Sequence, residues 1–227
     1  MPPCAARRRD PEVTISADKA TSWVYAEEFV SQDEPALRAR ERAEQLGTGA
    51  VPPGTAAVLS VLAAAAKARA VVEIGTGTGV ASLALLRGMP TDGVLTTIDQ
   101  DAEHHRAAKE SFAEAGIRPT RTRTISGRPL DVLPRLTDAA YDLVLVNLSA
   151  PVLDAAAEYL AQAIRLLRPG GVLAVDHALW YDRVADPARR DEATTSVREL
   201  GRAVRSDERL LPALVPVGDG LLVAVRR

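Results

Sequence analysis

From residue 70 onward, the pattern of hydrophobic and polar positions switches repeatedly between two periods. Short apolar runs rich in β-branched residues predict buried strands at 70–74, 93–99, 120–125, 141–147 and 171–176. Between these runs, apolar positions recur every three or four residues, which predicts helices at 80–87, 101–115 and 152–168 and a helical turn at 130–136. Such an alternation is typical of an α/β domain with a mostly parallel sheet.

The two ends of the chain depart from this alternation. Near the start, helices are predicted at 17–30 and 33–46, and a third follows the loop around Pro52 and Pro53. Near the end, a helix at 187–206 precedes two apolar runs, LLPALVPV and LLVAVRR, which Gly-Asp-Gly joins as a β-hairpin. We therefore expect extra N-terminal helices and an antiparallel hairpin at one edge of the sheet.

Length and composition fit one globular domain. The chain has 227 residues, of which 47% are hydrophobic and 26% charged, and this suffices for a single core. We expect residues 1–16 to form a flexible tail, and residues 17–227 to form a single domain with a helical cap at 17–68.

Charge and cysteine content exclude several classes of protein. The formal net charge of -2 gives no reason to expect binding to nucleic acid or to a membrane, and Arg7-Arg8-Arg9 is interpreted as part of a solvated tail. The N-terminal sequence lacks the apolar run of a signal peptide. The single cysteine, Cys4, cannot form an intramolecular disulfide or a cysteine metal cluster, so we expect a cytoplasmic protein.

The strongest local signal is the stretch VVEIGTGTGVASLALL, residues 71–86. A predicted strand ends there, glycines follow at positions 75, 77 and 79, and a helix begins. Glycine allows tight turns and close contact with a ligand, while the helix start offers N–H groups. A dinucleotide site, as in a nicotinamide-dependent oxidoreductase, is the alternative, but its fingerprint places the third glycine one residue later.

An acidic residue follows at the end of the next strand. Asp99 closes the stretch TTIDQD, one strand–helix–strand unit after Glu73. A carboxylate there can accept both hydroxyl protons of an adenosine ribose. Capping of the next helix is the alternative role, but Asp101 suits it better and leaves Asp99 for a ligand.

Taken together, these motifs resemble the class I S-adenosylmethionine (SAM)-dependent methyltransferases. The matching stretches are EIGTGTG, TTID, YDLVLVN and LLRPGGVLAVD, in the family's order over residues 50–226. GAVPPGTAAVL, DHALW and PVGDGLLVAVR are similar to the catechol O-methyltransferase-like group, which includes bacterial cation-dependent O-methyltransferases. The resemblance implies a Rossmann-like fold with a mostly parallel seven-stranded sheet, and transfer of a methyl group from SAM to a hydroxyl of a small acceptor, which we expect to be aromatic.

The resemblance also implies where SAM lies. Val51 covers the methionine side, Asp99 binds the ribose hydroxyls, and Gln100 lies beside the adenine. Arg128 lies either over the adenine or toward solvent. The family's serine two positions after the last glycine is Ala81 here, with Ser82 next to it. The full set of expected cofactor-binding residues is Val51, Glu73, Gly75, Thr76, Gly77, Gly79, Asp99, Gln100, Arg128 and Ser149.

The expected reaction centre departs from the family. There, a divalent metal held by carboxylates acidifies the acceptor, and a lysine acts as base. In this chain Asn147 replaces the fourth-strand aspartate, Ala150 replaces the lysine, and Asp176-His177 replaces an Asp-Asn pair. Asn147, Asp176 and His177 are the candidate catalytic residues and the candidate metal ligands, with metal dependence weakened or lost. His177 in a hydrogen bond to the backbone is the alternative.

The acceptor side is defined less sharply. Asn147, Trp180 and Tyr181 are the candidate substrate residues, although the two aromatics could instead pack against the hairpin. Trp23 and Tyr25 could close the pocket, and we expect a homodimer through the N-terminal helices. Because two polar groups are missing, a SAM-binding protein without catalysis, acting as a regulatory or scaffold subunit, is the alternative function.

Overall fold

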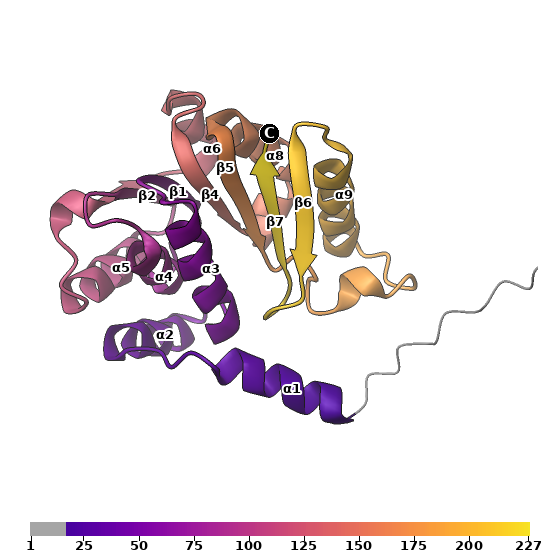
Figure 1. Ribbon diagram of the computed structural model, residues 1–227, viewed down its shortest axis with the longest axis horizontal. Helices are drawn as coiled ribbons and strands as arrows, with labels where there is room; N and C mark the ends of the chain where they lie inside the picture. Colours follow the sequence, from indigo (N-terminus) through magenta and orange to yellow (C-terminus); the bar gives the residue numbers. More distant parts are fainter. Residues whose placement is uncertain (1–16) are drawn as a thin grey trace, which may run out of the picture.

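The computed structural model describes residues 17–227, so the predictions for the tail 1–16, including Cys4 and Arg7-Arg8-Arg9, lie outside the described residues. In this part of the chain, seven strands form one sheet in the order β3-β2-β1-β4-β5-β7-β6 (Figure 1). The strands are β1 (Ala70–Ile74), β2 (Val94–Asp99), β3 (Thr122–Ser126), β4 (Tyr141–Asn147), β5 (Leu167–Asp176), β6 (Leu210–Val215) and β7 (Leu221–Arg226).

The direction of the strands brings the predicted site residues to one edge. β1, β2, β3, β4 and β5 are parallel, and β7 inserts antiparallel between β5 and β6. The carboxyl ends of β1, β2, β4 and β5 therefore meet, with Asn147 directly opposite Asp176. The predicted fold class, a Rossmann-like sheet with a C-terminal antiparallel hairpin and extra N-terminal helices, is confirmed.

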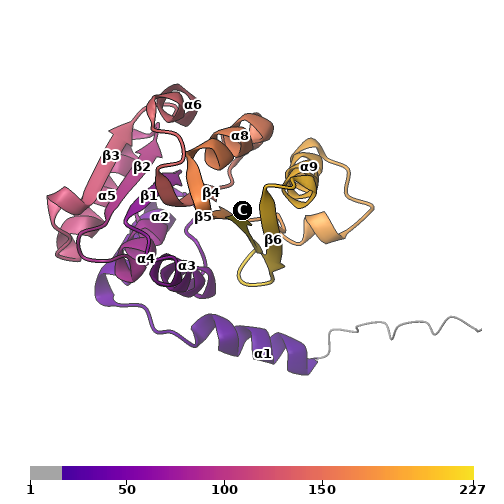
Figure 2. The ribbon, with the colours of Figure 1, turned by 45° about the horizontal axis from the view of Figure 1, so that its top comes forward.

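Helices cover both faces of the sheet, which makes a three-layer arrangement (Figure 2). One face carries α3 (Pro53–Ala65), α4 (Val80–Gly88) and α5 (Ala102–Glu114), with α1 (Ala17–Glu28) and α2 (Glu34–Leu46) beyond them. The other face carries α6 (Pro129–Val132), α7 (Ala150–Leu153), α8 (Ala156–Leu166) and α9 (Glu192–Ser206). The side chains of neighbouring β1 residues point to opposite faces of the sheet. Val71 packs in the hydrophobic core on the first face, and Val72 packs in the core on the second.

Aspartate caps set several helix starts where the sequence predicts them. The carboxylate of Asp33 accepts a hydrogen bond from the Ala36 amide, and that of Asp101 accepts one from the Glu103 amide. The helix predicted at 187–206 is shorter at its start, because Asp191 caps it by accepting from the Thr194 amide. Residues 183–185 form a separate 3-10 turn.

The single helix predicted at 152–168 is wrong. Ala155 has a non-helical backbone that separates α7 from α8, and α8 ends at Leu166. Leu167 already pairs with Tyr141 in the sheet, so the Pro-Gly-Gly sequence lies inside β5, with a shift of register, rather than marking a helix end. Sheet pairing thus overrides the helical period of the last residues. No helix in residues 17–227 combines the length and apolar character needed to cross a membrane.

Candidate active site

A cavity of about 500 Å³ lies at the carboxyl ends of β1, β2, β4 and β5. The loop at 48–51 also lines it, with the Gly49 carbonyl close to Gly77 of the glycine loop. The predicted cofactor-binding residues that line it are Val51, Gly75, Thr76, Gly77, Asp99, Gln100 and Ser149. The predicted reaction-centre residues Asn147, Asp176 and His177 line the same cavity. The predicted cofactor-binding residues and the predicted reaction-centre residues, which are far apart in the sequence, therefore line the same cavity.

The glycine loop needs glycine at all three positions. Gly75, Gly77 and Gly79 have φ values of 87°, 51° and 91°, in the region that side chains disfavour. A Cβ on Gly75 would lie 3.3 Å from the Cβ of Asn147, and one on Gly79 would lie 3.1 Å from the Phe112 ring. Gly79 itself packs against α5 and does not line the cavity. The loop is thus held close to both β4 and α5.

Glu73 lies beneath this loop rather than in the cavity. Its side chain is fully buried, and its Oε2 accepts hydrogen bonds from the hydroxyls of Ser82 and Thr97. Burial raises the pKa of Glu73 to about 7, although the hydroxyl donors oppose the shift. Glu73 is therefore placed as an internal support of the loop, without access to a ligand.

Asp99 connects β2 to the glycine loop and to α5. Its Oδ2 accepts from the Gly77 amide at 3.0 Å and lies 3.1 Å from Nδ1 of His104, while its Oδ1 accepts from the Asp101 amide. His105 is buried with Nε2 3.0 Å from the carbonyl oxygen of Asp99. Both histidines thus contact Asp99, because α5 begins directly beside it. These contacts fix the carboxylate at the cavity wall.

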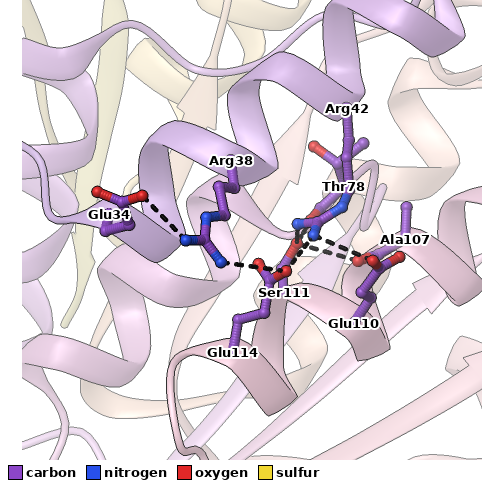
Figure 3. Close-up of polar contacts among 8 residues, drawn as sticks. All are labelled: Glu34, Arg38, Arg42, Thr78, Ala107, Glu110, Ser111 and Glu114. Carbon is purple, nitrogen blue, oxygen red and sulfur yellow. Dashed lines mark hydrogen bonds and ion pairs between the residues drawn. The ribbon is translucent and has the colours of Figure 1, made fainter.

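The cap helix α2 holds the glycine loop from outside (Figure 3). The hydroxyl of Thr78 donates to the Ala39 carbonyl, and the hydroxyl of Ser111 on α5 lies 2.9 Å from the Thr78 carbonyl. Arg42 of α2 donates to Ser111 and pairs with two glutamates of α5, Glu110 and Glu114. The hydrogen bond from Arg42 to Glu114 raises the pKa of the Arg42 guanidinium above its ordinary value. Cap, loop and α5 are thus one connected unit.

At two cofactor-side positions, Ala81 and Arg128, the sequence departs from the family, and the structure shows where each side chain lies. Ala81 lines the cavity where the family has a serine, while the hydroxyl of the neighbouring Ser82 is buried against Glu73. Arg128 is exposed at the start of α6 and does not line the cavity; Pro129 does. The alternative that Arg128 faces solvent therefore fits the structure.

Asn147 has a structural task that an aspartate could not perform. Its Nδ2 donates to the Gly75 carbonyl at 2.6 Å, so the amide ties the end of β4 to the glycine loop. A carboxylate at this position would offer a second acceptor to the same carbonyl. The Oδ1 of Asn147 is buried and has no hydrogen-bond partner. Asn147 therefore lines the cavity and has one side-chain oxygen without a partner.

Asp176 and His177 are adjacent at the end of β5. Both carboxylate oxygens of Asp176 are buried without a hydrogen-bond partner, and burial raises the pKa of this carboxyl. Nε2 of His177 lies 3.5 Å from Oδ2 of Asp176, while Nδ1 lies 3.0 Å from Oδ2 of Asp219. The imidazole is therefore flanked by two carboxylates.

Sequence reasoning missed Asp219 and Glu27. Asp219 lies in the Gly-Asp-Gly turn, where the sequence indicates only a hairpin. Glu27 of α1 accepts from the amides of Gly54 and Gly218, which joins α1, α3 and the hairpin. Neither residue has a local sequence signal, because the partners of Asp219 lie about 40 residues away and the Glu27–Gly218 bond spans 191 positions.

Trp180 and Tyr181 lie beside the centre rather than in the cavity wall. Their ring centroids are 5.4 Å apart, and the Tyr181 ring is 6.0 Å from that of His177. Neither lines the cavity, and Tyr181 is exposed. Trp180 is packed against the core cluster that includes the hairpin residue Leu222, as the alternative interpretation expects.

The predicted metal ligands do not fit a resident divalent ion. Mg²⁺ prefers several charged oxygen ligands, and this set offers one carboxylate and one neutral amide. The third member, His177, has Nδ1 against Asp219 and Nε2 3.5 Å from Asp176 without a hydrogen bond, and imidazole is a softer ligand than Mg²⁺ prefers. Within residues 17–227, no group of three or more Asp, Glu, His or Cys side chains is arranged to hold a metal. The unpaired oxygens of Asn147 and Asp176 instead suit a hydroxyl donor.

The chain is similar to proteins that are described as O-methyltransferases. The family model described as "O-methyltransferase" matches residues 27–227. A "Probable O-methyltransferase" of Mycobacterium tuberculosis strain H37Rv is 52% identical over 204 residues, which cover 90% of each chain.

Solved structures that are similar to this chain support the same family. A protein of Corynebacterium glutamicum has a TM-score of 0.82 and 35% identity, over 91% of this chain and 97% of that one. The O-methyltransferase TomG of Streptomyces achromogenes, solved with SAM, has a TM-score of 0.79 and 29% identity, over 91% and 96% of the two chains. The predicted enzyme class and methyl donor are thereby confirmed: the chain belongs to the O-methyltransferase family.

Proposed function

We propose that SAM occupies the cavity in a fixed orientation. The methionine part lies between Val51 and the glycine loop, the ribose on Asp99, and the adenine beside Gln100. Thr76, Gly77 and Ser149 complete the walls, while Gly79 and Glu73 support the loop from behind. The supporting observation is the Asp99 carboxylate, held by the Gly77 amide at the cavity wall, with a lone pair of Oδ1 left for a ribose hydroxyl.

The proposed acceptor is a small hydroxylated, aromatic molecule. Its reacting oxygen lies beside Asn147, Asp176 and His177, the three residues proposed as catalytic, and its ring is bordered by Trp180 and Tyr181. Three unpaired buried oxygens of Asn147 and Asp176 support this placement, because an acceptor hydroxyl can donate to them. Exposed aromatics elsewhere, Trp23 and Tyr25, lie on α1.

The reaction is an in-line displacement. The acceptor oxygen attacks the sulfonium methyl, the carbon–sulfur bond breaks, and its electron pair passes to sulfur, which leaves S-adenosylhomocysteine. Holding the two reactants together supplies much of the rate enhancement without further chemistry. We propose that this enzyme has weakened or lost metal dependence, because its ligand set does not fit a divalent ion.

Titration with S-adenosylhomocysteine and an acceptor panel test this function. Calorimetry should show binding of one S-adenosylhomocysteine per chain, and catechol-like acceptors should be methylated with and without EDTA. Absence of binding at millimolar ligand would refute the cofactor site. Binding without turnover of any acceptor would favour the alternative, a regulatory or scaffold protein, which the loss of carboxylate at 147 and lysine at 150 motivates.

We further propose a cytoplasmic homodimer built from the domain 17–227, with the cap 17–68 at the interface. α1 exposes several large apolar side chains, and an apolar cavity of about 490 Å³ lies between α1, α2, α3 and α4. The exposed apolar side chains of this region are Trp23, Val24, Tyr25, Phe29, Val30 and Leu37. Sedimentation equilibrium should give twice the chain mass, and Phe29→Glu should give the monomer.

A further inference from the structure

We propose that Asp219 is a positioning residue that holds His177 as the proton acceptor of the reaction, in the place where relatives of this group use a metal and a lysine. The inference rests on the proposed function for the methyl-transfer step. The arrangement of Asp219 and His177 itself can be tested without any turnover.

The contact between the two side chains sets the position of the ring proton. A carboxylate accepts hydrogen bonds and donates none, so the Nδ1 of His177, 3.0 Å from Asp219, must carry the hydrogen. In the neutral ring Nε2 then has the free lone pair. This nitrogen lies 3.5 Å from Oδ2 of Asp176, at the cavity wall that both residues line. The basic nitrogen thus lies at the proposed position of the acceptor hydroxyl.

Asp219 also shapes the segment that carries His177. Its Oδ1 accepts from the Tyr181 amide at 2.7 Å, and its carbonyl accepts from the Leu179 amide at 2.8 Å. His177, Trp180, Tyr181 and Asp182 all have φ between 49° and 60°, a left-handed conformation that costs free energy in residues other than glycine. Such strain persists where surrounding contacts enforce it, and here Asp219 supplies them.

The turn that bears Asp219 is itself fixed. A Cβ on Gly218 would lie 2.4 Å from the Thr55 hydroxyl, and one on Gly220 would lie 2.5 Å from Cγ of Leu179. The Gly218 amide donates to Glu27 of α1. The hairpin turn therefore cannot move away from His177 without breaking contacts with α1, α3 and the 177–182 segment.

The charged and titratable groups around the ring come from several elements. Asp176 on β5 and Asp219 on the hairpin turn flank it, and the Tyr181 ring lies 6.0 Å away. Arg183 stands 6.0 Å over the Tyr181 ring, and Glu27 lies behind the turn. Each ring nitrogen of His177 therefore has a carboxylate beside it, Asp219 at Nδ1 and Asp176 near Nε2.

The proton balance is complete within the chain. The O–H bond of the acceptor breaks, its proton bonds to Nε2 of His177, and the oxygen electron pair forms the bond to the methyl carbon. The carbon–sulfur bond of SAM breaks and its electrons remain on sulfur. The imidazolium, paired with Asp219, later releases the proton to water. No external base or metal enters these steps.

The first experiment measures the ring tautomer directly. The chain has three histidines, so protein labelled with ¹⁵N-histidine gives ring signals from three residues. Comparison with the His177→Gln variant identifies the ring signals of His177. We expect wild-type His177 to carry its hydrogen on Nδ1 and Asp219→Ala to move the population toward Nε2–H. An Nε2–H tautomer in the wild type, or a tautomer unchanged in Asp219→Ala, overturns the proposal even if no acceptor is ever found.

The second experiment separates positioning from folding. With EDTA present, Asp219→Ala should lower kcat about a hundredfold, as expected for loss of a general base, and leave the Kd for S-adenosylhomocysteine within about twofold. Asp219→Asn, which keeps one acceptor oxygen, should recover part of kcat. Asp207→Ala, at a turn that contacts Arg209 instead, is the matched control and should keep full activity.

Two kinetic outcomes contradict the proposal. Wild-type activity that EDTA abolishes and Mg²⁺ or Mn²⁺ restores would assign the proton transfer to a metal. Equal losses of kcat and of S-adenosylhomocysteine affinity in Asp219→Ala would mean that Asp219 stabilises the fold and does not position His177. Failure of the proposed function has a different signature, because S-adenosylhomocysteine would then not bind, or no acceptor would react while the tautomer remained as expected.

Discussion

The two halves of the cavity differ in how completely their polar groups are paired. On the cofactor half, both carboxylate oxygens of Asp99 at the cavity wall accept hydrogen bonds from amides, and one also contacts His104. Glu73 lies beneath the loop, outside the cavity lining; its Oε2 accepts from two hydroxyls, while its Oε1 is buried without a partner. On the acceptor half, Asn147 and Asp176 keep three buried oxygens without a partner. The first half is organised before any ligand arrives, whereas the second still needs a hydrogen-bond donor.

This difference explains why the missing family residues matter less than expected. Preorganised groups bind a common cofactor without further ordering of the protein. Unpaired buried oxygens are costly unless a ligand or proton satisfies them, so they favour binding of a hydroxyl. Under the proposed function, the acceptor half receives a hydroxyl donor beside the imidazole of His177, which two carboxylates flank.

Asp99→Ala should have the largest effect and fall on the cofactor half. A charge-assisted hydrogen bond to the ribose is worth up to about 3 kcal/mol, which corresponds to a loss of up to about a hundredfold in affinity for S-adenosylhomocysteine. Calorimetry measures this change directly. Asp191→Ala, which removes the cap of α9 far from the cavity, is the control. Unchanged affinity in Asp99→Ala would contradict the proposed orientation of the cofactor.

Glu73→Gln tests whether the support beneath the loop works as a neutral group. The pKa of Glu73 in the folded protein, about 7, lies above its ordinary value of 4.5, so its stabilising contribution is complete below pH 4.5 and is lost as the pH rises through 7. The variant cannot ionise. It should therefore exceed wild type in stability near pH 8, by up to about 3 kcal/mol, and match it near pH 4.

Urea denaturation at the two pH values measures this difference. The exposed acid Glu199, changed to glutamine, serves as control and should show no such dependence. A variant that is equally destabilised at both pH values would mean that the folded protein needs the charge of Glu73.

Asn147→Asp tests the link between the halves. Loss of the donor to Gly75 and repulsion from its carbonyl should weaken S-adenosylhomocysteine binding about tenfold, or about 1.4 kcal/mol. The added carboxylate opposite Asp176 should at the same time strengthen Mn²⁺ binding. Calorimetry with each ligand measures both effects. Unchanged Mn²⁺ affinity would mean that a metal cannot sit at this position even with the family residue restored.

Arg42→Ala should have the smallest effect. Removal of its contacts with Ser111, Glu110 and Glu114 should lower the free energy of unfolding by about 1 kcal/mol and S-adenosylhomocysteine affinity by about twofold. Arg38→Ala, whose ion pairs with Glu34 and Glu114 are more exposed, should change both by less. A larger loss in Arg38→Ala would place the main attachment of the cap elsewhere.

The sequence predicts the cofactor half far better than the acceptor half, for a physical reason. The glycine loop and Asp99 depend on backbone conformation and strand ends, which local patterns of glycine and apolar residues determine. Even there, the role of Glu73 as a buried support was missed, because burial by Ser82 and Thr97 depends on packing between strands and a helix.

The acceptor half depends on contacts between distant segments. Asp219 reaches His177 across the hairpin turn, and Glu27 reaches the same turn from the first helix. No spacing rule in one sequence connects such residues. The end of α8 at Leu166 was missed for a similar reason, since the pairing of Leu167 with Tyr141 in the sheet overrides a continuous helical pattern.

The hydrogen bond from Asn147 to Gly75 also has a consequence for the order of events in catalysis. One amide serves the loop that receives the methyl donor and, through its free oxygen, the place that receives the acceptor. Seating of the donor on the loop fixes the direction of that oxygen before the acceptor arrives. We therefore expect a compulsory kinetic sequence, with SAM entering first and S-adenosylhomocysteine leaving last.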